Sequence, residues 1–190
     1  VDKAYWESMQ MDYAIADLEN EALLKKYEEL ELLLPDNYMV FYNYAIDIDR
    51  YVNSADSKGK DIAAYKKKIP ELFKKAISIK STIEANLQMA NWHYNASFES
   101  QDMASRIKGT KPEEVKRKKE LLAAVNENLS NAIPYGEEAV RLLSGLKEYK
   151  FSDKTNYKLA LEILASAYKH TGNATKAAEC EKKKMEVDKL

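Results

Sequence analysis

The sequence is poor in residues that break helices and in residues that commonly hold metals or disulfides. Its 190 residues include 5 Gly and 4 Pro, too few for the many turns of an all-β fold. Cys180 is the single cysteine, so the chain cannot form an internal disulfide. Its longest apolar runs are short of the 18 residues that a spanning helix needs, which predicts that no segment spans a membrane.

The motifs of common enzymes and metal sites are absent as well. Neither His93 nor His170 has Glu three residues before it, so the Glu-x-x-His pair of di-iron helical bundles is missing. The sequence also lacks H-E-x-x-H, G-x-x-x-x-G-K-[ST] and G-x-S-x-G. A zinc site would need both histidines and Cys180 to converge. We expect instead a packed, hydrogen-bonded His93, an exposed His170 near a helix end and a half-buried Cys180, with no catalytic residue, metal or cofactor.

The charge of the chain is balanced, because 30 Lys and Arg stand against 31 Asp and Glu. The formal net charge of −1 provides no long-range field toward nucleic acid or acidic lipid. The basic runs at 66–68 and 116–119 have acidic residues close by, which indicates solvated helix faces rather than a nucleic-acid site. The compartment stays open between the cytoplasm and an exported, periplasmic location with a leader removed ahead of Val1.

Helix-forming sequence is what the chain has in abundance. Apolar residues make up 45% and charged residues 32%, as is typical of a soluble protein, and the abundant Ala, Leu, Lys and Glu favour helix. The clearest pattern is LEILASAYKHTGNATKA at 161–177. Gly172 and Asn173 predict the end of one helix there, and Ala177 is small enough for the next helix to pack closely on the first. The residues with the spacing of one helix face are Leu161, Leu164, Ala165 and Tyr168.

This stretch resembles the tetratricopeptide repeat, a helical hairpin with the pattern W-x2-L-G-x2-Y followed by A-x3-F and P. Leu161 stands at the Trp position, Ala165 at the Gly position and Glu181 at the Phe position. The resemblance implies an all-α, right-handed stack of about four antiparallel helical hairpins, an α-solenoid, in one domain over 1–190. The repeats are expected at 3–35, 36–81, 82–145 and 146–190. The second and third are lengthened, as in a variant found in bacterial repeat proteins.

The first repeat is open to two interpretations. Trp6, Met9, Tyr13 and Ala22 fall at the offsets of the repeat pattern, which favours a hairpin whose turn lies at residues 16–18. The alternative is one unbroken helix from residue 4 to 33. Asp36 and Asn37 follow and are expected to cap the next helix.

The third repeat is predicted to be a long hairpin. Its first helix should end near Arg106, and Thr110 with Glu113 resembles a capping box that starts the second helix. We expect the second helix to pack on the first with Leu122, Val125 and Leu129 against Tyr94, Phe98 and Met103. Its apolar stripe is Val115, Leu122, Val125, Leu129, Ala132, Gly136, Ala139 and Leu143.

The resemblance implies a binding surface rather than an active site. In tetratricopeptide repeats the second, fifth, ninth and twelfth positions of each repeat line a concave groove, and Asn91 resembles the asparagine that holds a ligand backbone in peptide-binding members. We therefore expect a non-catalytic scaffold that binds an unidentified protein or peptide. The alternative is a structural spacer or oligomerisation module without a groove ligand. The candidate contact residues are Tyr42, Asp49, Asn91, Tyr94, Glu162, Ser166 and Lys169.

Overall fold

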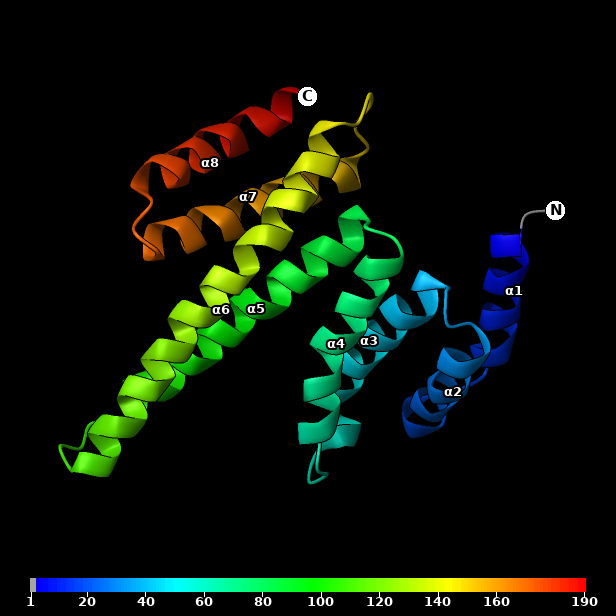
Figure 1. The fold of residues 1–190 in the computed structure, drawn as a ribbon, viewed down its shortest axis with the longest axis horizontal. Helices are drawn as coiled ribbons and strands as arrows, with labels where there is room; N and C mark the ends of the chain where they lie inside the picture. The colour runs from blue at the N-terminus through cyan, green and yellow to red at the C-terminus, as the bar shows by residue number, and fades with distance from the viewer. Residues whose placement is uncertain (1–2) are drawn as a thin grey trace. The chain divides into compact units, whose positions relative to one another are not determined.

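The computed structural model describes residues 3–190, apart from the side chains of residues 3–5 and 8. Every regular element in this part of the chain is a helix (Figure 1), so the all-α prediction is confirmed. The chain divides into two compact units, Val1–Ser81 and Thr82–Leu190, between the second and third predicted repeats. The elements are α1 (Lys3–Ile15), α2 (Asn20–Leu33), α3 (Tyr38–Val52), η1 (Ala55–Ser57), α4 (Ala63–Ile79), α5 (Ile83–Arg106), α6 (Pro112–Ser144), α7 (Phe151–His170), α8 (Ala174–Glu186) and η2 (Val187–Lys189).

The first unit begins with a hairpin, not with one long helix. Residues 16–19 separate α1 from α2, and the backbone N–H of Leu18 donates to the carbonyl of Ile15 at 3.0 Å. Asn20 starts α2 with a φ of 51°, a left-handed conformation that Asn tolerates better than most residues. Of the two interpretations of residues 4–33, the hairpin is therefore confirmed.

The core of the first unit lies between α2, α3 and α4. Tyr27 of α2 stacks on Tyr44 of α3 with ring centroids 5.0 Å apart, and both rings are fully buried. Helix α3 also packs against α4. Phe41 of α3 is buried, and the Lys75 ammonium of α4 lies 5.5 Å from the centroid of its ring. Asn37 caps α3 as expected, because its Oδ1 accepts from the Met39 N–H at 3.0 Å.

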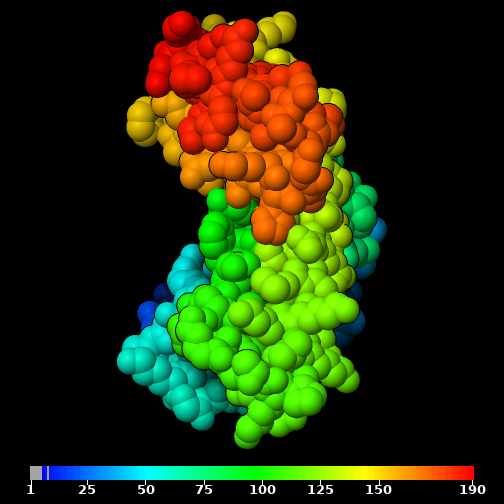
Figure 2. Space-filling view, turned by 90° about the vertical axis from the view of Figure 1, so that its left-hand side faces the viewer, coloured from blue at the N-terminus to red at the C-terminus, as the bar shows by residue number. Residues whose placement is uncertain are grey.

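The second unit consists of two hairpins, α5/α6 and α7/α8. Helix α7 packs against α6 and α8 and also contacts α5, so α7 and α8 cover one end of the α5/α6 pair (Figure 2). Small side chains allow this close approach. The cluster where α5, α6 and α7 meet contains Leu87, Ala90, Ala132, Ala139, Ala160 and Ile163.

The predicted boundary between α7 and α8 is confirmed. Gly172 has a φ of 83°, and Asn173 caps α8 by accepting from the Lys176 N–H at 3.1 Å. Ala177 is buried and packs with Leu164 and Tyr168 of α7, as its small size led us to expect.

The apolar stripe of α6 differs from the prediction at its start. Leu121 is buried, whereas Leu122 is 39% exposed and Val115 is exposed too. The expected partners Phe98 and Met103 are also exposed, so the predicted packing of Leu122 on them is wrong. The reason is geometric, because the half of the hairpin that contains the α5–α6 turn extends beyond α7 and α8 (Figure 1). Two helices alone bury one face each, and the other apolar side chains stay in solvent.

The start of α6 is also capped one residue later than predicted. The N-cap residue is Lys111, and its backbone N–H donates to the Glu114 carboxylate at 3.2 Å. Thr110 with Glu113 was therefore the wrong pair. Pro112 is the first residue of the helix, where its missing N–H costs nothing.

The two leucines of α6 provide a matched test of this packing. Leu129 is 4% exposed, so Leu129→Ala should lower the free energy of unfolding by roughly 2–5 kcal/mol through lost contacts and the cavity that remains. Leu122→Ala should cost less than about 1 kcal/mol, as at other exposed positions. Urea denaturation followed by circular dichroism measures both, and equal losses would contradict the packing described here.

Gly136 lies at a close approach of α6 to α7. A Cβ atom at this position would lie 2.9 Å from Leu164 Cδ2 and 3.0 Å from its Cγ, and Leu164 is buried. Gly136→Val should therefore overpack the crossing and cost roughly 1–3 kcal/mol, although the helix propensity of Val exceeds that of Gly.

Gly145→Ala is the control for this substitution, because a Cβ there meets nothing closer than 3.5 Å. In thermal unfolding it should stay near the parent. If Gly136→Val unfolds at the same temperature as the Gly145→Ala control, the two helices are not in close contact.

Candidate functional site

The candidate contact residues of the first unit lie on the solvent side of α3. Tyr42 is half-buried and Asp49, seven residues later, is exposed, so both occupy one helix face. The Tyr42 ring is tilted toward Phe73 of α4 at a centroid distance of 6.0 Å. Asp49 Oδ1 accepts from Asn53 Nδ2 at 3.2 Å. Both side chains are thus held by neighbours while part of their surface meets water.

The other five candidates lie on α5 and α7 of the second unit, two helices that contact each other. Asn91 and Ser166 are half-buried, and Lys169 is exposed. Glu162 is exposed and forms an ion pair with Lys184 of α8 at 3.2 Å. An amide, a hydroxyl, a carboxylate and an ammonium are therefore present on adjacent helices. We call the five residues Asn91, Tyr94, Glu162, Ser166 and Lys169 the α5–α7 strip.

Tyr94 is more deeply embedded than a groove residue needs to be. Its ring meets Phe98 edge-to-face at 4.8 Å and packs against the buried cluster of Val125, Leu129 and Ala167. Leu87, another groove position of the repeat pattern, is buried in the core. One side of α5 is therefore covered by α7, and the accessible surface is narrower than the pattern implies.

His93, His170 and Cys180 have the environments that the sequence led us to expect. His93 is buried, and its Nδ1 lies 3.1 Å from Asn128 Oδ1, so Nδ1 carries a hydrogen that it donates to the amide oxygen. His170 is exposed in the last turn of α7. Cys180 is half-buried, and burial raises the pKa of its thiol. Among the residues that the structure describes, no three His, Cys, Asp or Glu side chains are grouped as metal ligands would be.

Tyrosine hydroxyls at the junction of three helices are a feature that the sequence analysis missed. In the second unit, Tyr168 of α7 donates to the carboxylate of Glu137 on α6. Lys176 of α8 donates to the same carboxylate at 2.9 Å and to the Tyr168 hydroxyl at 3.2 Å. Its ammonium lies 4.9 Å from the centroid of the Tyr168 ring, a cation–π distance. The three side chains thus connect α6, α7 and α8.

The first unit repeats this arrangement. Tyr51 of α3 donates to Glu21 of α2 at 2.8 Å, and Lys60 donates to Glu21 at 2.6 Å and to the Tyr51 hydroxyl at 3.1 Å. Tyr44 lies two turns before Tyr51 on α3 and has a similar partner. The ammonium of Lys68 on α4 lies 3.2 Å from the Tyr44 hydroxyl and 4.5 Å from the centroid of its ring. We call these groups the tyrosine networks. The high count of 13 Tyr was the available signal for them.

The tyrosine networks should make the free energy of unfolding fall at alkaline pH. Burial and the hydrogen bond to Glu137 raise the pKa of Tyr168 to about 12 from its usual value of 10.0. Since the folded chain holds this proton more tightly than the unfolded chain, the contribution of Tyr168 to stability is complete below pH 10 and is lost between pH 10 and about 12. We predict that Tyr168→Phe loses less stability than the parent between these two pH values.

Urea denaturation at pH 8, 10 and 11.5 is the measurement for this prediction. Tyr13→Phe is the control, because Tyr13 is 90% exposed and its hydroxyl is not enclosed by the fold. If Tyr168→Phe and the parent lose stability in parallel above pH 10, the Tyr168 hydroxyl does not contribute in this way.

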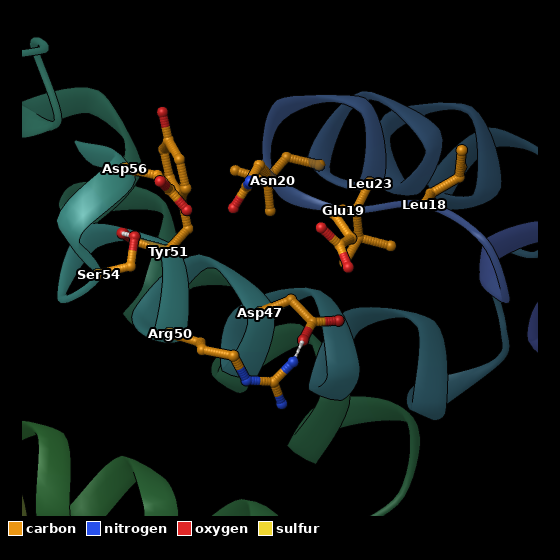
Figure 3. Close-up of a pocket in the computed structure, with 10 residues that line it drawn as sticks. Leu18, Glu19, Asn20, Leu23, Asp47, Arg50, Tyr51, Ser54 and Asp56 are labelled. Atoms are coloured by element: carbon orange, nitrogen blue, oxygen red, sulfur yellow. Dashed lines mark hydrogen bonds and ion pairs between the residues drawn. The ribbon is translucent and has the colours of Figure 1, made fainter.

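A cleft lies between the start of α2 and the end of α3 in the first unit. Its volume is about 330 Å³. Figure 3 shows Glu19 and Asn20 on the α2 side, Asp47, Arg50 and Tyr51 on the α3 side, and Asp56 at one end. We call it the α2–α3 cleft, and its lining residues are Leu18, Glu19, Asn20, Leu23, Leu24, Asp47, Arg50, Tyr51, Ser54 and Asp56.

The acidic side chains of the α2–α3 cleft differ in their hydrogen bonding. Asp47 accepts from Arg50 at 2.6 Å and from the Tyr27 hydroxyl at 2.8 Å, so both of its oxygens are used. Glu19 and Asp56 are exposed, and their carboxylates form no hydrogen bond or ion pair with any residue that the structure describes. The cleft therefore combines one neutralised carboxylate with two that face solvent.

A smaller pocket of about 270 Å³ lies in the second unit between the end of α6, the start of α7 and the end of α8. Lys183 donates to Ser144 Oγ at 3.2 Å, and Ser144 Oγ lies 2.6 Å from the Tyr157 hydroxyl. The arrangement repeats a tyrosine network with Ser in place of the acid. Glu186 also lines the pocket, opposite in charge to Lys183. The polar groups of Ser144, Tyr157 and Lys183 are hydrogen-bonded to one another.

Fold and sites together define an all-α protein built from helical hairpins, with polar clefts in both units. The chain belongs to a family of unknown function, the domain of unknown function DUF3837, whose model matches residues 68–171. The matched range runs from α4 to the end of α7 and includes the whole α5–α7 strip. No curated protein and no solved structure matches the chain. Within residues 3–190, no helix combines the length and the hydropathy that crossing a membrane requires.

Proposed function

We propose that the chain is a non-catalytic scaffold that binds a protein or peptide, and that its hairpins are tetratricopeptide-like. The proposal places the binding surface on the α5–α7 strip, with Tyr42 and Asp49 as the corresponding positions of α3. The partner is a protein segment, because the strip offers hydrogen-bonding and charged groups over two helices rather than one enclosed cavity.

The packing of the second unit supports the comparison with tetratricopeptide repeats. In stacked repeats each hairpin contacts its neighbours in the chain. Helix α7 contacts both α5 and α6, and Gly136 and Ala132 of α6 allow the close approach. Contacts between neighbouring hairpins of this kind support the comparison.

The observation that carries the binding proposal is the chemistry of the α5–α7 strip. Asn91 donates and accepts hydrogen bonds at once, which suits the alternating N–H and C=O groups of a peptide backbone. Glu162 and Lys169 are exposed and provide both signs of charge for the side chains of a ligand. Polar groups at the rim of an interface chiefly determine specificity and association rate.

A structural or oligomerisation module is the second candidate, and exposed apolar side chains favour it. Leu32 and Leu33 are adjacent residues at the end of α2, and they are 84% and 70% exposed. Large apolar side chains that gather on a surface indicate interaction sites. This candidate predicts a stable oligomer in sedimentation equilibrium, which Leu32→Ser together with Leu33→Ser would dissociate.

The binding proposal predicts the behaviour of two strip variants. Peptides selected on the immobilised chain from a random library should bind Asn91→Ala severalfold more weakly, because the loss of one hydrogen bond costs roughly 0.5–1.5 kcal/mol. Lys169→Ala should weaken the binding of acidic peptides and leave that of neutral peptides unchanged. Isothermal titration calorimetry provides the dissociation constants.

Lys118→Ala is the control, because Lys118 is exposed on α6 outside the strip. Binding that weakens in Lys118→Ala and not in the strip variants would disprove the assignment of the surface. Failure of every selected peptide to bind the chain in solution would disprove the binding function itself.

A further inference from the structure

We propose that the α2–α3 cleft binds the side chain of a lysine or arginine presented by a partner protein. The inference rests on the proposed function in one respect, because the cation is taken to belong to a protein segment. It adds a second recognition site, in the first unit, to the α5–α7 strip, and it states the chemistry of the residue that the site accepts.

The charges of the cleft define its ligand. Three carboxylates line it, those of Glu19, Asp47 and Asp56, against the guanidinium of Arg50. That guanidinium is 2.6 Å from Asp47, so it compensates neither Glu19 nor Asp56. The nearby ammonium of Lys60 is held by Glu21 at 2.6 Å and by the Tyr51 hydroxyl. Two negative charges remain for a ligand to neutralise.

The conformation of Glu19 leaves its carboxylate open to a ligand. Glu19 is the N-cap residue of α2, and its carboxylate makes no hydrogen bond to the backbone N–H groups of the helix. The shorter side chains of Ser, Thr, Asp and Asn are the ones that usually accept such a bond. Here the carboxylate lines the cleft instead (Figure 3), and the left-handed Asn20 that follows, with a φ of 51°, fixes the backbone next to it.

The apolar part of the cleft matches the stem of a long cationic side chain. Leu24 is almost fully buried and Leu18 and Leu23 are half-buried, and all three line the cleft. Lysine and arginine place their methylene groups on such surfaces while the charged head meets carboxylates or water. At about 330 Å³, the cleft is at the lower end of the roughly 300–1,000 Å³ of small-molecule sites, a size suited to one side chain.

The arrangement of the carboxylates favours an organic cation over a metal ion. A calcium site needs six to eight oxygen ligands and a magnesium site an octahedral set. Within residues 3–190 no three acidic side chains are grouped closely enough to hold a metal. Separated carboxylates on a rim suit a guanidinium or ammonium, whose hydrogens point in several directions.

The probe for this site is the blocked tripeptide acetyl-Gly-Lys-Gly-amide, titrated into the ¹⁵N-labelled chain and followed by NMR. The backbone amides of residues 18–24 and 47–56 should shift in a saturable way. The peptide with norleucine in place of lysine, which keeps the stem and lacks the charge, should produce no saturable shift there. Raising the salt concentration should weaken the binding of the lysine peptide, because the pair is exposed to solvent.

Glu19→Gln combined with Asp56→Asn should raise the dissociation constant of the lysine peptide by about tenfold, which corresponds to about 1.4 kcal/mol. Glu127→Gln combined with Glu179→Gln is the matched control, since both residues are exposed acids of the second unit, and it should bind as the parent does. Equal shifts with the norleucine peptide, or unchanged binding in the Glu19/Asp56 variant, would overturn the inference.

Comparison with the library-selected peptides separates the two proposals. If those peptides bind the α5–α7 strip while the lysine peptide leaves residues 18–24 and 47–56 unshifted, the cleft is not a cation site and the scaffold function stands. If the lysine peptide binds the cleft and no selected peptide binds the strip, the cleft is supported and the assignment of the strip is wrong.

Discussion

The folding of this chain depends on the burial of tyrosine rings whose hydroxyls must still find partners. A buried hydroxyl without a hydrogen bond costs about twice the energy that a satisfied one contributes. Tyr168 pairs with Glu137 of the preceding helix and Lys176 of the following helix. In the first unit, Tyr51 pairs with Glu21 of the preceding helix and with Lys60, which lies in the loop before α4. Because the partners come from separate elements, the requirement links the packing of successive helices. It is the polar counterpart of the small-residue contacts that bring the helices together.

The projecting half of the α5/α6 hairpin shows what happens where a third helix is missing. There the two helices bury Leu121 and Ala104, while Phe98 and Leu122 remain exposed. No tyrosine network described here lies in this part of the hairpin. Its stability therefore comes from one apolar seam, and local opening should be easier there than at the α6–α7 crossing, where Gly136 contacts Leu164.

Much of the fold was predictable because local signals determine where helices end. Gly172 with Asn173, the Asn37 cap and Pro112 each mark a boundary through backbone geometry that a single residue controls. The choice between Leu121 and Leu122 was not predictable, since each continues a 3–4 spacing to Val125 and the angle of the partner helix decides. The tyrosine networks and the α2–α3 cleft were missed for a related reason. Their residues, such as Leu18, Asp47 and Asp56, come from separate elements, and no spacing in the sequence connects them.

The balanced charge of the chain conceals which charges are available for recognition. A net charge of −1 produces no steering field, so the partner of the proposed scaffold would be selected at short range. Many acidic side chains are already used, as Asp47 is by Arg50 and Tyr27. The acids open to a ligand are those that the fold leaves without a partner. Glu19 is one of them, because its carboxylate lines the α2–α3 cleft and accepts no hydrogen bond from its own helix.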